Sequence, residues 1–464
     1  MAHNLQHNYA QEVWEKDRQH FVHPWTHFES FDKDGSLVMN EADGAYVTDI
    51  NGKRYLDGIG GLWCVNIGYG REEIVEAIAE QARKMPFFNP FVDTTNVPAA
   101  ELAAKLAELA PGDLSHTMFA GGGSTANDSA YRLIQYYQRD RGKPEKRNII
   151  ARKEAYHGST ELASGLSGKT ADRNPNFEYP HTNIHHISTP DIYRRPDGMS
   201  EDEFATFLVD EFEQKVLELG ADTVSAFWAE PIMGAGGVHV PPMKYFTGIR
   251  ALCDKYDILF VADEVVTGFG RVGHWFCAKD MFGVQPDVLV CAKGLTSGYQ
   301  PLGAAIFSDR IYKSISANPE NWFNNGFTYS GHPVACAAAL KNIEIMEREN
   351  LFGHVREVGP YFMERLQSLR DVAHVGDVRG SHFMACIEYV ANTETKEAFP
   401  YSVNIGKRVS NAAEKRGLIV RPVGHLNVLS PCLILTKEQC DTIVDVLRDS
   451  MTEVLAELSA DGVI

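Results

Sequence analysis

The stretch Val-Leu-Val-Cys-Ala-Lys-Gly at residues 288–294 decides how the rest of the chain is interpreted. Its apolar run predicts a buried strand. An ammonium group is costly to bury, so Lys293 at the end of that strand calls for a chemical role. A second apolar run, 258–262, ends in the same way in Asp263. Because ligands of open α/β sheets bind outside the carboxyl ends of the strands, we expect Lys293 and Asp263 to meet at that edge. A plain ion pair between the two strand ends is the alternative at this point.

Strands and helices alternate around this stretch. Short β-branched runs lie at 148–151, 223–229, 258–262 and 288–291, and helical patterns occur at 72–84, 99–109 and 334–350. The alternation predicts an α/β fold with a mostly parallel sheet. Nearer the N-terminus, residues 43–57 contain two alternating runs across Asn51-Gly52, which is the strongest turn signal for a β-hairpin.

Three segments are predicted from these patterns. Residues 1–64 are expected to contribute to a small domain, residues 65–333 to form the large domain, and residues 334–464 to form a smaller C-terminal α+β domain. The polar stretch from about 165 to 198 reads as a long loop. Structureless loops beyond ~15 residues are uncommon in compact domains, so we expect a functional role for it.

Composition narrows the class of protein. The chain has 464 residues, 44 Lys plus Arg against 62 Asp plus Glu, and a formal net charge of −18, which disfavours binding to nucleic acid or to an anionic membrane. No stretch approaches the ~18 apolar residues that a membrane span needs. The eight cysteines are scattered without paired spacing, as expected for reduced thiols in the cytoplasm. We therefore expect a cytoplasmic globular protein with no nucleic-acid or membrane partner.

A glycine-rich segment precedes the helical pattern at 126–138. Gly123, Ser124 and Thr125 end this segment, and exposed amides at the start of a helix form a seat for phosphate. The alternative is an ordinary helix-capping turn, because Ser and Thr are common N-caps.

Two other motifs argue against rival functions. The segment 268–273 matches the glycine fingerprint of dinucleotide-binding enzymes, but its glycines do not follow the strand directly and Asp287 precedes its strand instead of ending it. An NAD(P)-dependent or flavin-dependent oxidoreductase is therefore a remote alternative. His181, His185 and His186 lack the spacing of a zinc site, so no metal is expected.

A phosphate seat, an aspartate and a lysine remain, with Tyr156-His157-Gly158 between them. Pyridoxal 5'-phosphate needs these parts: an amine for a Schiff base, a carboxylate opposite the ring nitrogen, a flat side chain against the ring, and amides for the phosphate. The combination is far more specific than any one member.

At this point the chain resembles the class III pyridoxal-phosphate-dependent aminotransferases, and within them the ω-transaminases that exchange amino groups between an amine or ω-amino acid and pyruvate. The resembling blocks are 61–70, 156–158, 229–231, 262–265, 292–294, 327–333 and 417–422. The resemblance implies a fold-type I (aspartate aminotransferase-like) large domain with a mostly parallel sheet, and a smaller α+β domain. It also implies a small-molecule amine donor and a 2-oxo acid acceptor that react by a ping-pong mechanism.

The resemblance assigns roles around the cofactor. Lys293 corresponds to the lysine that holds the cofactor aldehyde and shuttles the proton, and Asp263 to the partner of the ring nitrogen. Tyr156 and Val265 are expected on opposite faces of the ring. The phosphate is expected at Gly123, Ser124 and the backbone of Thr125. His157, Glu230 and Phe327 are further expected cofactor-binding positions.

A second group is expected to bind substrate or to act across a subunit boundary. Arg421 corresponds to an arginine that grips a substrate carboxylate in bidentate fashion. Trp25, Trp63 and Phe91 are expected to line the substrate pocket with Tyr156, with simple core packing as the alternative. Thr328 resembles a residue that reaches the phosphate of the neighbouring subunit. Phe91 is likewise expected to contribute to the substrate pocket of the neighbouring subunit. The active unit would then be a homodimer or a dimer of dimers.

One departure and two alternatives stay open. The family commonly has Ser-Glu-Ala-Asn where this chain has Ser-Thr-Ala-Asn at 124–127. Because the backbone amide at this position is expected to bind the phosphate, Thr125 should preserve cofactor binding. The same scaffold also hosts aminomutases and a decarboxylase, which differ in what leaves the substrate carbon.

Overall fold

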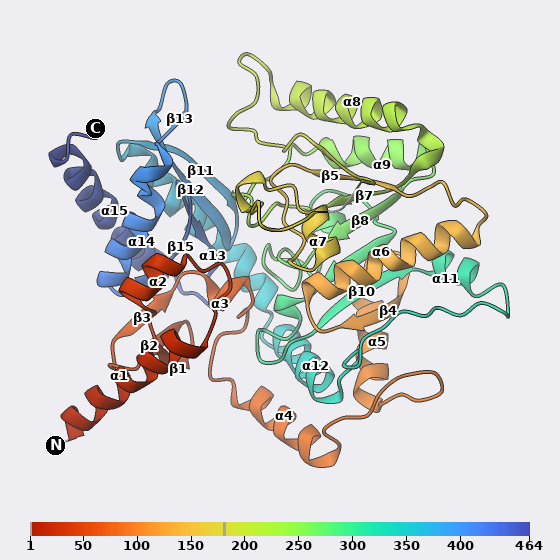
Figure 1. The fold of residues 1–464 in the computed structure, drawn as a ribbon, viewed down its shortest axis with the longest axis horizontal. Helices are drawn as coiled ribbons and strands as arrows, with labels where there is room; N and C mark the ends of the chain where they lie inside the picture. Colours follow the sequence, from red (N-terminus) through yellow and green to blue (C-terminus); the bar gives the residue numbers. More distant parts are fainter. Residues whose placement is uncertain (1, 180–181) are drawn as a thin grey trace.

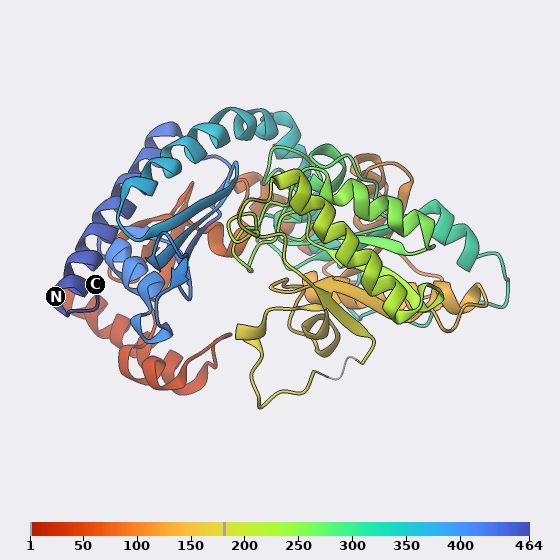
Figure 2. The ribbon, with the colours of Figure 1, turned by 90° about the horizontal axis from the view of Figure 1, so that it is seen from above.

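The computed structural model describes residues 2–179 and 182–464. The chain forms two side-by-side parts, a larger one around a wide central sheet and a smaller one that carries both termini (Figures 1 and 2). No helix in the described ranges is long and apolar enough to cross a membrane.

The larger part is built on a seven-stranded sheet in the order β4-β10-β9-β8-β7-β5-β6. Only β10 runs antiparallel to its neighbours β4 and β9, so the sheet is mostly parallel as predicted. The strands are β4 (Leu114–Ala120), β5 (Asn148–Arg152), β6 (Ile184–Ile187), β7 (Val224–Ala229), β8 (Leu259–Asp263), β9 (Val288–Cys291) and β10 (Gly303–Ser308). Every residue of β7, β8, β9 and β10 is buried. Helices cover both faces of such a sheet, which explains why these strands read as continuous apolar runs.

The helices of this part lie against the sheet and continue toward the smaller part (Figure 1). They are α4 (Glu72–Lys84), α5 (Val97–Leu109), α6 (Gly123–Asp140), α7 (Glu161–Leu166), α8 (Glu201–Leu219), α9 (Tyr245–Lys255), α10 (Cys277–Asp280), α11 (Asp309–Ile315) and α12 (Pro333–Arg348). Because α12 packs against α4 and α5 and also contacts α13, it connects the two parts. The boundary at 333/334 stays a prediction.

The smaller part contains two further sheets. One has the order β11-β12-β16-β15 with β13 beside β12, and the other the order β1-β2-β3-β14. The strands are β1 (Met39–Asp43), β2 (Tyr46–Asp49), β3 (Arg54–Asp57), β11 (Val375–Ser381), β12 (Met384–Asn392), β13 (Glu397–Ala398), β14 (Leu418–Ile419), β15 (Arg421–Val423) and β16 (Leu426–Leu429). The helices are α1 (Ala2–His20), α2 (Phe28–Asp34), α3 (Gly60–Trp63), α13 (Leu351–Gln367), α14 (Ile405–Lys415) and α15 (Lys437–Ala460).

The predicted hairpin is present, because β2 and β3 pair antiparallel across Asn51-Gly52. Strand β3 also pairs in parallel with β14, at Leu56 with Leu418 and at Asp57 with Ile419. The N-terminal hairpin and the C-terminal chain therefore share one sheet.

The stretch 165–198 is not the continuous loop that was predicted. It contains a short 3₁₀ turn at Thr170–Asp172 and the edge strand β6, which pairs in parallel with β5. The two isoleucines that end β6 are buried, whereas His185 and His186 between them are half-buried. A strand with only four residues and a polar centre has too weak an alternation to be recognised.

The glycine fingerprint at 268–273 forms a buried turn after β8. Arg271 in this turn is fully buried and donates to the carbonyls of Phe383 and Pro431 and, at 2.8 Å, to Oδ1 of Asn66. A turn filled by its own arginine and tied to the smaller part has a structural role and offers no phosphate loop.

Candidate active site

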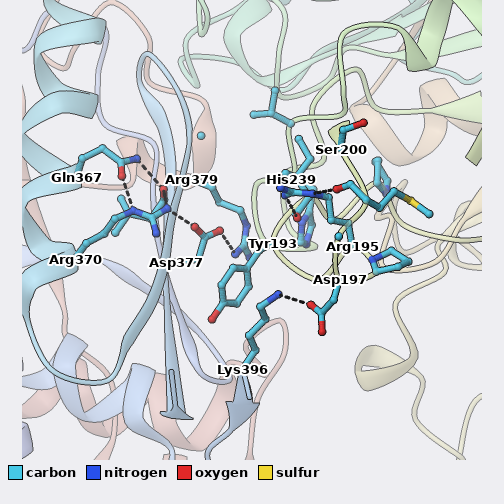
Figure 3. A pocket seen from close by; sticks show the side chains of 18 residues that line it. Tyr193, Arg195, Asp197, Ser200, His239, Gln367, Arg370, Asp377, Arg379 and Lys396 are labelled. Atoms are coloured by element: carbon cyan, nitrogen blue, oxygen red, sulfur yellow. Dashed lines mark hydrogen bonds and ion pairs between the residues drawn. The ribbon is translucent and has the colours of Figure 1, made fainter. Parts of the chain in front are cut away.

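A cavity of about 1010 Å³ opens at the carboxyl ends of β7, β8 and β9 and extends to the smaller part. It is lined by most of the predicted site residues: Trp25, Trp63, Gly123, Ser124, Tyr156, His157, Glu230, Asp263, Val265, Lys293 and Arg421. A second cavity of about 780 Å³, shown in Figure 3, lies between residues 190–200 and 367–396 and contains none of them. The first cavity is therefore the candidate active site.

Lys293 lies two residues after the end of β9 and lines this cavity. Its backbone has φ 44°, in the left-handed region that a non-glycine residue adopts at a cost of about 1 kcal/mol or more. Burial lowers the pKa of its amine, against the opposing effects of the Asp263 and Glu230 charges. Among the described residues, none forms a hydrogen bond or an ion pair with the Lys293 amine. The described residues therefore contain no plain ion pair between Lys293 and Asp263, and an unpaired amine on a strained backbone lines the cavity.

Asp263 ends β8 and is almost fully buried. Its Oδ2 lies 2.7 Å from Nδ1 of His157 and accepts a hydrogen bond at 3.0 Å from Nδ2 of Asn127, while Oδ1 accepts from the Val265 amide at 3.1 Å. Asn127 is itself fixed, because Trp228 Nε1 donates to its Oδ1 at 3.0 Å. These contacts orient the carboxylate toward the cavity.

Asn127 is a functional residue whose role sequence reasoning missed. It lies on α6, within the motif at 124–127, and also donates to the His157 carbonyl at 2.7 Å. The available signal was its place one helical turn after the predicted phosphate seat. Its contact with Asp263 joins residues far apart in the chain, which no local pattern reveals.

Glu230 follows β7 and is buried at the side of the cavity. Its Oε1 accepts from the Tyr156 amide at 3.1 Å and its Oε2 from the Gly234 amide at 2.7 Å. Burial raises its pKa, and the nearby Asp263 charge acts in the same direction. Glu230 thus fixes the backbone of the segment that carries Tyr156.

Helix α6 begins at Gly123, three residues before the predicted start, so Gly123, Ser124 and Thr125 form its first turn. The N-cap Gly122 provides no side-chain hydrogen bond, which leaves the first amides of this helix free for a ligand. A Cβ added at Gly123 would lie 3.1 Å from Cγ1 of Val265. The seat is therefore uncapped and closely confined.

Aromatic side chains border the cavity where the resemblance placed them. The ring centroids of Tyr156 and Trp25 are 6.3 Å apart. Trp63 is buried in the apolar core and also lines the cavity. Trp25 is 62% exposed, which excludes simple core packing for it.

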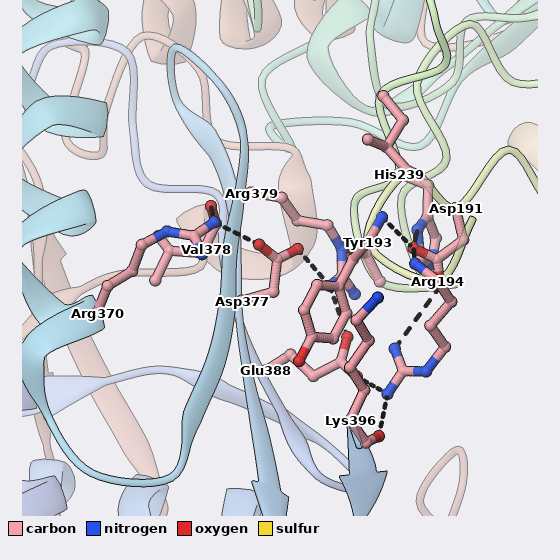
Figure 4. A network of polar contacts seen from close by, with 12 residues as sticks. Asp191, Tyr193, Arg194, His239, Arg370, Asp377, Val378, Arg379, Glu388 and Lys396 are labelled. Carbon is pink, nitrogen blue, oxygen red and sulfur yellow. Dashed lines mark hydrogen bonds and ion pairs between the residues drawn. The ribbon is translucent and has the colours of Figure 1, made fainter. Parts of the chain in front are cut away.

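Arg421 lies on β15 and is the predicted carboxylate-binding residue. Burial lowers the pKa of its guanidinium. Of the other lining cations, Lys169 pairs with Asp172 at 3.0 Å, and Arg194 and Arg379 pair with carboxylates in the network of Figure 4. Within residues 2–179 and 182–464, Arg421 is the one lining guanidinium that has no ion-pair partner.

Four predicted residues lie outside the lining of this cavity. Thr125 belongs to the first turn of α6 and donates from Oγ1 to the Gly122 carbonyl at 3.1 Å. Phe327 packs against the core, whereas Thr328 is exposed and Phe91 is 49% exposed. Thr328 and Phe91 thus do not reach the cavity of their own chain.

The histidines considered as metal ligands have other partners. Nε2 of His185 lies 3.3 Å from Oδ1 of Asn148, and Nε2 of His186 lies 3.1 Å from the Leu166 carbonyl. His181 lies outside the described residues. The residues that the structure describes hold no cluster of three or more side chains suited to a metal.

The side chains and backbone amides of the cavity match the chemical groups of pyridoxal phosphate. Nε2 of His157 is a buried polar atom without a partner in the described part of the chain. The amine of Lys293, the fixed carboxylate of Asp263 and the uncapped start of α6 supply the groups that the aldehyde, the ring nitrogen and the phosphate each require.

Comparisons with known proteins agree with this geometry. The sequence model of the family "Aminotransferase class-III" matches residues 30–451. The chain is 41% identical to the putrescine--pyruvate aminotransferase of Pseudomonas aeruginosa over 96% of both chains. An (S)-enantioselective omega-transaminase from Thermomicrobium roseum has a TM-score of 0.93 at 40% identity, covering 96% of this chain and 99% of that one. The omega transaminase from Pseudomonas jessenii, solved in complex with PMP, has a TM-score of 0.93 at 35% identity, with 96% and 99% covered. The chain therefore belongs to the class III aminotransferase family.

Proposed function

We propose that this class III aminotransferase moves an amino group from an amine or ω-amino acid to pyruvate, with donor and acceptor using the same cavity in turn. The observation that carries the proposal is an unpaired amine, Lys293, and an unpaired guanidinium, Arg421, in one confined cavity. Its relatives support both donor and acceptor, because they include a putrescine--pyruvate aminotransferase and omega-transaminases.

Pyridoxal phosphate, the cofactor of the family, supplies an electron sink that stabilises negative charge on the substrate carbon when it is bound. Lys293 would hold the cofactor aldehyde, and once released its amine would carry the proton to and from the substrate carbon. Because burial lowers the pKa of this amine, the neutral form that accepts a proton is available nearer to neutral pH.

The surrounding residues would hold and orient the cofactor. Asp263, positioned by His157 and Asn127, would keep the ring nitrogen protonated. Tyr156 and Val265 would confine the ring from its two sides. The amides and hydroxyl of Gly123 and Ser124 would bind the phosphate, assisted by the positive end of the α6 dipole.

Arg421 would select the carboxylate of the acceptor. A planar guanidinium binds a carboxylate with two parallel hydrogen bonds. Trp25 and Trp63 would provide an apolar surface for the hydrocarbon part of the amine donor. Together they account for a site that accepts both a charged acid and an apolar amine.

A donor and acceptor screen tests this proposal. β-Alanine, taurine, 4-aminobutyrate, putrescine and 1-phenylethylamine would each be offered with pyruvate and, separately, with 2-oxoglutarate. We expect alanine to form from pyruvate, and Lys293→Ala to abolish it. Carbon dioxide release, or an isomerised product without any acceptor, would instead establish the decarboxylase or aminomutase alternative.

The exposed residues Thr328 and Phe91 support a homodimer as part of the proposal. They lie in an aromatic patch in which the rings of Phe87 and Tyr329 are 5.6 Å apart and Phe91 lies 4.0 Å from the Cβ position of Gly326. An exposed group of large apolar side chains is typical of a protein interface. Thr328 would then reach the phosphate in the partner subunit, and Phe91 would complete the partner's substrate pocket.

A cytoplasmic location is the final part of the proposal. All eight cysteines are free, and seven of them are buried. Free thiols are typical of a reducing compartment. Cell fractionation with an antibody against the native protein would test the location.

A further inference from the structure

A network of charged side chains forms the far wall of the active-site cavity, where the two parts of the protein meet (Figure 4). Its centre is Glu388 on β12, whose side chain is only 1% exposed. Oε2 of Glu388 pairs with Nη1 of Arg379 at 2.6 Å, and Oε1 pairs with Nη2 of Arg194. Arg194 comes from the larger part and Glu388 from the smaller one, so this pair joins the two parts along the cavity wall.

The network is electrically balanced. Its three guanidinium groups, Arg194, Arg370 and Arg379, face three carboxylates, Asp191, Asp377 and Glu388. The histidines beside it are His239, whose Nδ1 lies 3.5 Å from Asp191, and His425, whose Nε2 lies 3.6 Å from Glu388. Lys396, which Figure 4 also shows, pairs with Asp197 at 4.0 Å. With neutral histidines the wall therefore has no net charge.

Glu388 and Arg421 project from the same face of the same sheet. Cys386 on β12 lies opposite Val428 on β16, which lies opposite Arg421 on β15. Directly opposed residues share a face, and so do residues two apart along one strand, which places Glu388 on the face of Arg421. Two strand spacings and two residues separate their Cα atoms by about 12 Å. A dicarboxylate held by Arg421 at one end therefore has this wall within its reach.

The pairing of Arg194 with Glu388 affects which carboxylate substrates the cavity can bind. A substrate with one carboxylate needs only Arg421, whereas a second carboxylate would have to lose its water against a wall whose guanidinium groups are already paired. Leaving a buried charge without a partner costs free energy. Discrimination by withholding a partner from the competing substrate is as effective as added contacts to the preferred one.

We propose that the Arg194–Glu388 pair sets acceptor specificity, because it leaves Arg421 as the one carboxylate-binding guanidinium of the described cavity and so excludes acceptors with a second carboxylate. This inference rests on the proposed function. Arg194 and Glu388 are positioning residues in it. Arg194 itself lines the active-site cavity, so its guanidinium has room to turn toward a substrate once it is released from Glu388. The second cavity of Figure 3 adjoins the other side of the network through Arg370, Asp377 and Arg379.

Two variants of opposite charge test the inference. Glu388→Gln releases Arg194, whose remaining carboxylate, Asp191, lies 3.7 Å away, and gives the wall a net charge of +1. We expect kcat/KM for 2-oxoglutarate relative to pyruvate to rise about tenfold, the effect of one charge-assisted hydrogen bond. Arg194→Gln leaves excess negative charge, and the same ratio should fall. The double variant Arg194→Gln with Glu388→Gln should return close to the wild-type ratio.

Binding without turnover provides the second readout. Calorimetric titration of each holoenzyme with glutarate and with butyrate compares two acids of similar size that differ by one carboxylate. The glutarate-to-butyrate affinity ratio should rise in Glu388→Gln and fall in Arg194→Gln. Glu357→Gln is the matched control, because Glu357 pairs with Lys437 on the exposed surface at 3.2 Å, away from both cavities.

The outcomes are distinct. Opposite shifts in the two variants support the inference, whereas equal ratios in wild type and both variants, with butyrate binding retained, overturn it. A loss of folding lowers both members of a ratio together, and Arg194→Gln, at a half-exposed side chain, then decides the question alone. Failure of wild type to form alanine from pyruvate would instead contradict the proposed function, and the titration would still report on the wall.

Discussion

At the scale of single residues, Lys293 combines two costs that folding alone would not retain. Its backbone is in the left-handed region, and its amine is buried without a partner in the described chain. Lys146 is also buried, but it donates to the carbonyls of Val224, Tyr256 and Asp257 at 3.1, 3.0 and 2.8 Å. The comparison separates a lysine kept for chemistry from one kept for structure.

The first prediction follows from this contrast and concerns the cofactor-free protein. Burial lowers the pKa of Lys293 below the ordinary 10.5, so unfolding takes up a proton between its folded pKa and about 10.5. The stability of wild type therefore falls as pH decreases through that window, whereas methionine carries no such proton. We expect Lys293→Met to be more stable than wild type at pH 7, with a difference that shrinks as pH rises toward 10.5. Urea unfolding at several pH values measures it.

Lys146→Met is the contrasting variant. Its three carbonyl acceptors lose their donor, which costs about 1–3 kcal/mol or more. If both substitutions destabilise the protein equally at pH 7, the Lys293 amine has a structural partner. Its assignment as an unpaired amine kept for chemistry would then be wrong.

A second residue-scale prediction concerns Arg421. Because one bidentate pair with a carboxylate is lost, Arg421→Gln should raise the KM for pyruvate about tenfold to a hundredfold. The rate of amino-group release from 1-phenylethylamine in single-turnover experiments should change little, since this donor has no carboxylate. Equal losses for donor and acceptor would show that Arg421 supports the fold of β15 instead.

At the scale of elements, strands were predicted better than the ends of helices. The apolar runs at 258–262 and 288–291 became β8 and β9 within one residue, because burial on both faces leaves an unmistakable pattern. Helix α6 began three residues early, since glycines are poor helix formers and only the folded site holds them there. Strand β6 was missed because its pairing with β5, and not its own composition, stabilises it.

The uncapped start of α6 gives the third prediction. Gly123→Ala places a Cβ 3.1 and 3.2 Å from the two methyl groups of Val265, so the Val265 side chain, which we propose confines the ring, must shift. We expect the affinity for pyridoxal phosphate to fall about tenfold or more, the loss of one charge-assisted hydrogen bond. Fluorescence titration of the cofactor-free protein measures this affinity.

Helix propensity favours the same substitution, because alanine stabilises a helix by about 1 kcal/mol relative to glycine. The free energy of unfolding of the cofactor-free variant should therefore be no lower than that of wild type. Lower stability together with unchanged cofactor affinity would contradict a phosphate seat at this helix start.

At the scale of the whole molecule, the contacts that tie the two parts together could not be predicted from sequence patterns. The parallel pairing of β3 with β14 joins residues at opposite ends of the chain, and the buried Arg271 joins a turn after β8 to Phe383 and Pro431. Such contacts depend on the folded geometry alone. The Arg194–Glu388 pair belongs to the same class, which is why no motif revealed it.

The fourth prediction tests whether the active site is shared between subunits. Thr328 is exposed and does not line the cavity of its own chain, so in a symmetric dimer it would serve the partner's phosphate seat. Thr328→Asp would place a carboxylate against that phosphate, and we expect it to abolish activity, as we expect of Lys293→Ala. In a mixed dimer of the two variants, both defects fall in the same site and the other site is intact.

Unfolding and refolding an equimolar mixture should therefore restore about a quarter of wild-type activity, because half of the dimers are mixed and each has one competent site. Each variant refolded alone is the control. A mixture that stays inactive would place Thr328 in the site of its own chain, and a Thr328→Asp variant that is active alone would place it outside any site.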